Sequence, residues 1–228
     1  MSKTIIGVGA LISLGAGTLV AQKTEIRFGG TILGTQRNVA LDSSNISRLS
    51  GTSSGGEFVA RGSGGGIMLR YAHAGFPNAA SGTTQKDLTV ADGRVFLGPQ
   101  AFAVELGYMR RSQSSGLFND PGEHLALLGA RSVVSLGPSG FAVSFAGQAI
   151  GRLEKDTATV RGTGSSGKAK VAGWTLETRL LYQAPRRLPF FAMIGYRFER
   201  FRHKKLEGGL SEESSGVLIG AGLRLVRF

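Results

Sequence analysis

The sequence contains no cysteine, which excludes disulfide bonds, thiolate metal sites and a cysteine nucleophile. Proline is scarce, with 6 residues among 228, and the 36 glycines follow no three-residue period, so a collagen-like chain is excluded as well. The apolar share of 41% and the 13 phenylalanines argue against a disordered chain. Abundant glycine and phenylalanine are instead typical of twisted strands joined by flexible loops.

Runs of basic residues are also missing, although the formal net charge is +12. No four consecutive residues are all Lys or Arg, and no recognition-helix pattern is present. We therefore expect no nucleic-acid partner, because dispersed basic residues suit an anionic membrane surface better. Lysines in the polar connections can bridge the phosphates of an outer leaflet such as lipopolysaccharide, or they can serve only as solubilising charges.

Long apolar runs are absent except at the N-terminus. A short basic start, residues 1–3, precedes a mostly apolar and uncharged stretch over residues 4–20, and small Ala21 is followed by polar residues. This pattern predicts a secretory signal peptide over residues 1–21, cleaved after Ala21, and a single domain over residues 22–228. A transmembrane helix is the alternative, but the stretch is short and interrupted by glycines.

The remaining chain alternates between apolar and polar residues over segments of about ten residues, the length that a transmembrane β-strand needs. In residues 102–111, Phe102, Leu106 and Tyr108 fall on one face, whereas Glu105 and Arg111 fall on the other. Residues 174–183 and 192–199 repeat the pattern. The alternation predicts an all-β, antiparallel, up-and-down transmembrane barrel; a soluble β-sandwich is the alternative.

Connections between these segments alternate in length from residue 76 onward. Short turns rich in Gly and Pro lie at 97–100, 136–140 and 184–189, and longer polar connections lie at 76–86, 112–122, 153–168 and 204–214. Outer-membrane barrels have short periplasmic turns and long external loops. Eight strands follow, near 65–75, 87–97, 100–112, 123–136, 139–152, 169–183, 188–203 and 215–228. Alternating residues at 25–33 and 57–61 add two more, and we prefer ten strands to eight with an N-terminal extension.

A barrel of this size sends one face of every strand into a lumen filled by side chains. The charged residues expected there are Glu25, Arg27, Glu57, Arg61, Arg70, Asp92, Arg94, Glu105, Arg111, Arg131, Arg152, Glu177, Arg179, Arg197 and Glu199. Because an unpaired buried charge is costly, we expect these side chains to form a salt-bridged polar core. A narrow pore that favours anions is the alternative.

Aromatic residues are expected to form two girdles where the strands meet the lipid headgroups. The external girdle comprises Tyr71, Tyr108, Trp174, Tyr196 and Phe198, and the periplasmic girdle comprises Phe102, Phe141, Tyr182 and Phe190.

These features together resemble the small outer-membrane barrel proteins of the OmpA/OmpX type. The resemblance rests on the signal-like residues 1–21, the repeated alternation, the Gly-Pro turns and the terminal run 223–228. It implies a location in a bacterial outer membrane, with Phe228 as the signal read by the barrel-assembly machinery. Arg224 departs from the pattern counted back from Phe228, so we expect a β-bulge near Leu225–Val226, or an end that overhangs the membrane.

The function expected from these residues is structural or surface-interacting and non-enzymatic, in a chain without metal or cofactor and favoured as a monomer. A small passive, anion-leaning channel is one alternative. The other is an outer-leaflet lipid-modifying enzyme that uses a histidine at the barrel rim. His73, His124 and His203 all fall near external strand ends, with Glu123 beside His124 and Ser112, Ser114 and Ser115 in a nearby loop. No compact catalytic motif joins them, so no catalytic residue is assigned.

Overall fold

The structure is a computed structural model that describes residues 24–41, 44–77, 87–114, 123–153, 157–159, 166–168, 170–184, 189–204 and 210–227. The predicted signal peptide and Phe228 lie outside the described residues. No helix in the described part of the chain is long and apolar enough to cross a membrane.

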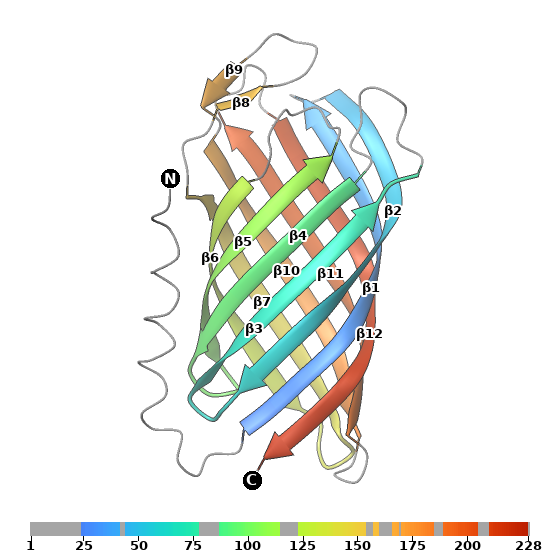
Figure 1. Cartoon of the computed structure of the whole chain (residues 1–228), viewed down its shortest axis with the longest axis vertical. Coiled ribbons are helices and arrows are strands. Elements are labelled where there is room, and N and C mark those ends of the chain that lie inside the picture. The colour runs from blue at the N-terminus through green and yellow to red at the C-terminus, as the bar shows by residue number, and fades with distance from the viewer. Residues whose placement is uncertain are drawn as a thin grey trace, which may run out of the picture.

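Ten antiparallel strands close into a barrel (Figure 1). The wall strands are β1 (Thr24–Leu41), β2 (Ser44–Arg61), β3 (Gly65–Gly75), β4 (Asp87–Leu97), β5 (Ala103–Ser114), β6 (Glu123–Ser135), β7 (Phe141–Arg152), β10 (Lys170–Gln183), β11 (Phe190–Lys204) and β12 (Leu210–Arg227). Each wall strand pairs with the wall strands that precede and follow it in the sequence, and β12 closes the barrel against β1. The short strands β8 (Thr157–Thr159) and β9 (Ser166–Lys168) form a separate ribbon beyond one end of the barrel (Figure 1).

The preferred count of ten strands is confirmed, so the N-terminal segment belongs to the wall. Three boundaries were predicted too short: β1 and β2 have 18 residues each, and β12 begins at Leu210 rather than near 215. The apolar alternation fades in the added parts because their outward side chains, such as Gln36, Ser50 and Thr52, are polar and exposed. The hairpin β8–β9 was not predicted.

The short turns between β4 and β5 and between β6 and β7 fall where Gly and Pro predicted them. Gly98, Gly137 and Gly140 have positive φ angles of 117°, 87° and 82°, a conformation that other residues adopt at a cost. Both turns lie at the same end of the barrel as the start of β1 and the end of β12 (Figure 1). In outer-membrane barrels the short turns face the periplasm, and this end is called the periplasmic end below.

The predicted bulge near Leu225–Val226 is wrong, because β12 pairs with β1 in one unbroken register from Thr24↔Arg227 to Leu41↔Leu210. Leu223 and Leu225 point outward with 59% and 60% of their surface exposed. Arg224 points into the lumen, where its Nε lies 3.0 Å from Glu25. The outward phase of β12 therefore follows its odd-numbered residues, and Arg224 is in phase with the lumen.

The outer face of the wall is apolar where the strands are regular. Ile32, Leu128, Leu176, Ile194 and Ile219 are each more than half exposed, and they lie on different strands around the barrel. A water-soluble protein rarely exposes so large a contiguous apolar surface, whereas membrane hydrocarbon requires one. The chain is therefore a transmembrane barrel.

Candidate functional site: the charged lumen

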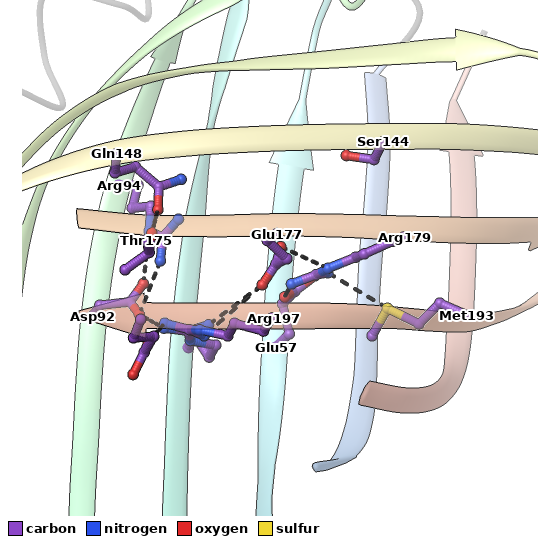
Figure 2. A network of polar contacts seen from close by, with 12 residues as sticks. Glu57, Asp92, Arg94, Ser144, Gln148, Thr175, Glu177, Arg179, Met193 and Arg197 are labelled. Carbon is purple, nitrogen blue, oxygen red and sulfur yellow. Dashed lines mark hydrogen bonds and ion pairs between the residues drawn. The ribbon is translucent and has the colours of Figure 1, made fainter. Parts of the chain in front are cut away.

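The centre of the lumen contains a polar network built around buried carboxylates (Figure 2). Glu105 on β5 has none of its surface exposed. It accepts hydrogen bonds from Arg131 Nε at 2.5 Å, from Gln148 Nε2 at 2.5 Å and from Arg94 Nη1 at 3.5 Å. Thr175 on β10 donates its hydroxyl to Gln148, so the network extends over five strands.

A bidentate ion pair crosses the lumen beside this centre. Arg179 on β10 donates from both terminal nitrogens to the two carboxylate oxygens of Glu57 on β2, each at 2.8 Å. Its Nε lies 2.8 Å from Glu177 on the same strand. Since β11, β12 and β1 lie between β10 and β2 in the wall, this pair spans the barrel interior.

Further arginines complete the central network. Asp92 on β4 forms ion pairs with Arg70 and with Arg94, whose Nε lies 3.0 Å away. Glu177 receives longer-range contacts at 3.8 Å from Arg70 and at 3.9 Å from Arg197. Asp92, Glu105 and Glu177 thus each face more than one guanidinium, an arrangement that offsets the cost of removing these charges from water.

A second cluster closes the lumen toward the external end. Arg111 on β5 donates to Glu212 on β12 at 2.8 Å and to Glu123 on β6 at 3.1 Å. Arg37 on β1 also donates to Glu212. The Arg111 guanidinium lies 4.1 Å from the ring centroid of Phe201, a cation–π contact. Because four strands separate β5 from β12 in either direction, this cluster joins opposite walls.

The periplasmic end of the lumen has a sparser arrangement. Glu25 lies 3.3 Å from Arg27 Nε and 3.0 Å from Arg224 Nε, and Gln183 donates to it at 3.5 Å. Arg61 donates to the backbone carbonyl of Pro99 at 2.9 Å.

Fourteen of the fifteen charges predicted for the lumen have described side chains, and the alternation of each strand turns all fourteen inward. The side chain of Arg152 lies outside the described residues. Four further charged residues also face the lumen, although they were not predicted to do so: Arg37, Glu123, Glu212 and Arg224. Extending the two-residue period of β1 and β12 to their full lengths would have found three of them.

Little free space remains between these side chains. One cavity of about 50 Å³ lies between the central network and the external cluster, beside Arg37, Arg70 and Arg197. Another of about 20 Å³ lies near the periplasmic end, beside Arg27, Arg61 and Arg131. Such volumes hold about one water molecule or a few.

The outer face carries the aromatic residues predicted for the girdles. Trp174 stacks on Phe198 with ring centroids 4.9 Å apart toward the external end. Tyr182 contacts Phe141 at 5.0 Å and Phe190 at 6.0 Å toward the periplasmic end. Exposed and half-buried rings on neighbouring strands therefore gather at both ends of the apolar band. The remaining predicted girdle residues, Tyr71, Phe102, Tyr108 and Tyr196, are also exposed on the outer face.

The rim histidines have ordinary cross-strand partners. His73 Nδ1 lies 3.1 Å from the Thr89 hydroxyl, and its Nε2 lies 3.7 Å from Asp87. His124 hydrogen bonds to the hydroxyl of Tyr108. The side chains of His203, Ser114 and Ser115 lie outside the described residues, and no serine whose side chain is described pairs with a histidine. The described part of the chain also contains no group of three or more His, Asp or Glu suited to a metal ion.

No protein-family model matches the chain, and no curated protein matches it. Solved structures do resemble it. The outer-membrane protease OmpT from Escherichia coli aligns with a TM-score of 0.53 and 8% identity, covering 92% of this chain and 99% of that one. Neisserial surface protein A aligns with a TM-score of 0.46 and 12% identity, covering 86% of this chain and 96% of that one. Ail, the attachment invasion locus protein of Yersinia pestis, aligns with a TM-score of 0.29 and 12% identity, covering 90% and 99%.

At 8% identity, the likeness to OmpT shows the fold alone. The predicted resemblance to small outer-membrane barrels is confirmed at that level. Closed antiparallel barrels with an apolar exterior and a polar interior are the form in which β-structure crosses bacterial outer membranes. Fold and exterior together place the chain in an outer membrane.

Proposed function

We propose that the chain is a non-conducting, non-enzymatic outer-membrane barrel whose role is to present an external surface for interaction. The observation that carries this proposal is the pair of charged crossings at two levels of the lumen. Arg179 joins Glu57 across three intervening strands, and Arg111 joins Glu212 on the opposite wall. An aqueous pore would require both crossings to separate and leave buried charges without partners.

The external surface extends beyond the apolar band on one side of the barrel. β1, β2 and β12 have 18 residues each, whereas about 9–11 residues are enough to cross the bilayer. The surplus corresponds to roughly 25 Å of strand at about 3.3 Å per residue. Outward side chains on these extensions are polar and exposed, including Gln36, Asn38, Ser50 and Thr52. The polar outer face of these strand extensions suits contact with another molecule in water better than contact with lipid.

Single-channel recording in planar bilayers tests the closed lumen. The purified protein should give no resolvable openings under conditions in which a known porin conducts. Regular voltage-independent openings of the unmodified protein would overturn the proposal in favour of a passive channel. The lumen arginines would then make anion selectivity the next quantity to measure.

The alternative of a lipid-modifying enzyme predicts a change in the outer-leaflet lipids. Mass analysis of lipid A from cells with and without the protein should give the same species under the proposal. A new acylated or deacylated species that is lost in a His124→Ala variant would overturn it. The Tyr108–His124 pair on the outer face makes His124 the histidine to test.

We also propose that the external rim contacts anionic lipid and that the chain is a monomer inserted by the barrel-assembly machinery. Arg110 and Arg202 point outward above the external girdle and are exposed. Guanidinium groups at this height can bridge lipopolysaccharide phosphates. Native mass spectrometry of the purified protein should detect a bound lipopolysaccharide that a double Arg110→Gln, Arg202→Gln variant retains less well.

A further inference from the structure

In the described part of the lumen, the inward charges balance except at the periplasmic end. Above that end, the described inward side chains comprise seven carboxylates and seven guanidinium groups: Glu57, Asp92, Glu105, Glu123, Glu177, Glu199 and Glu212, and Arg37, Arg70, Arg94, Arg111, Arg131, Arg179 and Arg197. At the periplasmic end, Glu25 stands against three arginines, Arg27, Arg61 and Arg224. The described part of the lumen therefore carries its whole excess of positive charge, two units, at one place.

The carboxylate at this end is already shared. Glu25 lies within 3.3 Å of Arg27 and within 3.0 Å of Arg224, and it also accepts from Gln183. Among the described residues, Arg61 contacts no carboxylate, and its guanidinium donates to the carbonyl of Pro99. Within the described part of the chain, the guanidinium of Arg61 therefore has no carboxylate partner, and Arg27 and Arg224 share the carboxylate of Glu25.

Two buried donors near this end have no hydrogen-bond partner among the described residues: Nε of Arg61, and Nη2 of Arg131, which borders the cavity of about 20 Å³ from the side of the central network. Nε of Arg27 is buried as well, and it lies 3.3 Å from Glu25 without a well-aligned hydrogen bond. The Arg131 side chain is 7% exposed, and its Nη2 lies 3.8 Å from Glu177, beyond hydrogen-bond distance. Arg61 and Arg131 both lie over the ring of Phe96, at 5.5 and 5.6 Å from its centroid. Stacking on one ring holds the two guanidinium groups near each other despite their like charge.

The cavity of about 20 Å³ lies among these donors, and its polar lining comprises four arginines, two carboxylates, Gln100 and Ser144. The arginines are Arg27, Arg61, Arg131 and Arg179. The carboxylates are Glu25, paired with Arg27 and Arg224, and Glu57, paired with Arg179. The cavity volume admits one water-sized group. It therefore fits a single oxygen of an anion whose remaining atoms stay at the mouth. Arg61 is only half-buried there, so the anion can be reached from the periplasmic water.

We propose that the periplasmic mouth of the barrel binds an oxyanion of the phosphate type. Guanidinium groups present paired donors in a planar fork that matches the oxygens of a phosphate, and charge-assisted bonds of this kind are stronger than neutral ones. The excess of two positive charges matches in magnitude the two negative charges of a monohydrogen phosphate. A chloride ion would neutralise positive charge, but it would not offer several oxygen atoms to accept directional hydrogen bonds from the guanidinium groups. The inference does not depend on whether the lumen conducts.

Calorimetric titration of the full-length protein in non-ionic micelles tests the site. Inorganic phosphate, added at constant ionic strength against chloride, should bind saturably with a stoichiometry of one. Arg61→Gln and Arg27→Gln should each weaken binding about tenfold or more, since each removes a charge-assisted contact. Arg200→Gln is the matched control, because it removes the same charge from the outer face at the external end. Arg61→Lys, which keeps the charge and loses the fork, should bind between Arg61→Gln and the unmodified protein.

The heat-modifiable shift on gels verifies that every variant is folded before titration. Saturation by chloride at the same concentration as phosphate would overturn the proposal, and so would equal losses in Arg200→Gln and Arg61→Gln. A second probe is short-chain phosphatidylglycerol in mixed micelles. If it binds, if inorganic phosphate competes with it and if Arg61→Gln abolishes its binding, the site is the same and a lipid headgroup is the source of the phosphate. If neither inorganic phosphate nor phosphatidylglycerol binds saturably, the proposal is overturned.

Discussion

Burial decides how much a charged pair contributes to stability, and the barrel offers one buried and one exposed carboxylate that the same substitution can compare. Glu105 is fully buried and accepts hydrogen bonds from two arginines and from Gln148. Glu213 forms a 3.0 Å ion pair with Arg200 on the outer face, where the two side chains are 37% and 34% exposed. The same substitution, Glu to Gln, removes one negative charge at either position and changes the volume little.

We expect Glu105→Gln to destabilise the folded barrel by about 3–5 kcal/mol, because it leaves the guanidinium of Arg131 buried without its nearest carboxylate. The other contact of Arg131 to a carboxylate, at 3.8 Å to Glu177, is too long to replace it. Glu213→Gln should cost about 0–1 kcal/mol, since water and salt screen an exposed pair.

Urea unfolding in lipid vesicles measures both values. The chain has one tryptophan, Trp174, which stacks on Phe198 on the outer face, so its fluorescence reports the loss of the barrel wall. Equal midpoints for Glu105→Gln and Glu213→Gln, at an unchanged slope, would contradict the expected difference in stability. The lumen network would then be solvated in the membrane, and its ion pairs would not keep the pore closed.

Two further predictions concern the wall. Leu176→Arg, on the outer face at the middle of β10, should destabilise the barrel by about 2–4 kcal/mol in vesicles. Thr52→Arg, on the extension of β2, should have almost no effect. Equal losses of stability in urea unfolding would place the extension inside the bilayer. Gly55→Ala should cost about 1–3 kcal/mol, because the added Cβ would lie 2.1 Å from the backbone oxygen of Tyr71. Gly34→Ala, with no atom within 4 Å of the added Cβ, should be neutral or stabilising, and a reversed order in unfolding midpoints would contradict the packing.

The sequence predicted the regular wall because each strand there has one face in lipid and one in the lumen. Residues 102–111 and 174–183 alternate cleanly for that reason, and the charged side chains on their inward faces are buried. The parts that were missed lie where the outer face leaves the hydrocarbon. Beyond that point, residues 35–38 of β1 and residues 211–215 of β12 are polar on both faces, so the period of two carries no hydropathy signal there, and Arg37 and Glu212 were left out.

The error at the C-terminal strand has a different cause. Counting back from Phe228 assumed that the final aromatic residue and the lipid face share one phase. The odd-numbered residues from Val217 to Leu225 are those that face outward, so Arg224 is a lumen residue paired with Glu25. Its partner lies 199 residues away in the chain, and no local pattern could have supplied it.

The abundance of glycine, the strongest compositional signal, has a role in closing the lumen. Arg179 reaches Glu57 past the inner faces of β11, β12 and β1. On β12 and β1 the nearby inward positions include Gly220, Gly222 and Gly29. A Cβ at Gly29 would lie 2.8 Å from the Phe191 ring, and one at Gly220 would lie 2.5 Å from the side chain of Met193.

Met193 Sδ in turn lies 3.4 Å from a terminal nitrogen of Arg179 (Figure 2). Larger residues at the glycines would push the β11 side chains into the path of the guanidinium. The long arginine on one wall and the small residues on the next two strands are therefore parts of one arrangement. The glycines leave room in the lumen, and the long side chain of Arg179 extends through that room to Glu57. If every inward residue were of intermediate size, no side chain could cross the lumen to form this ion pair.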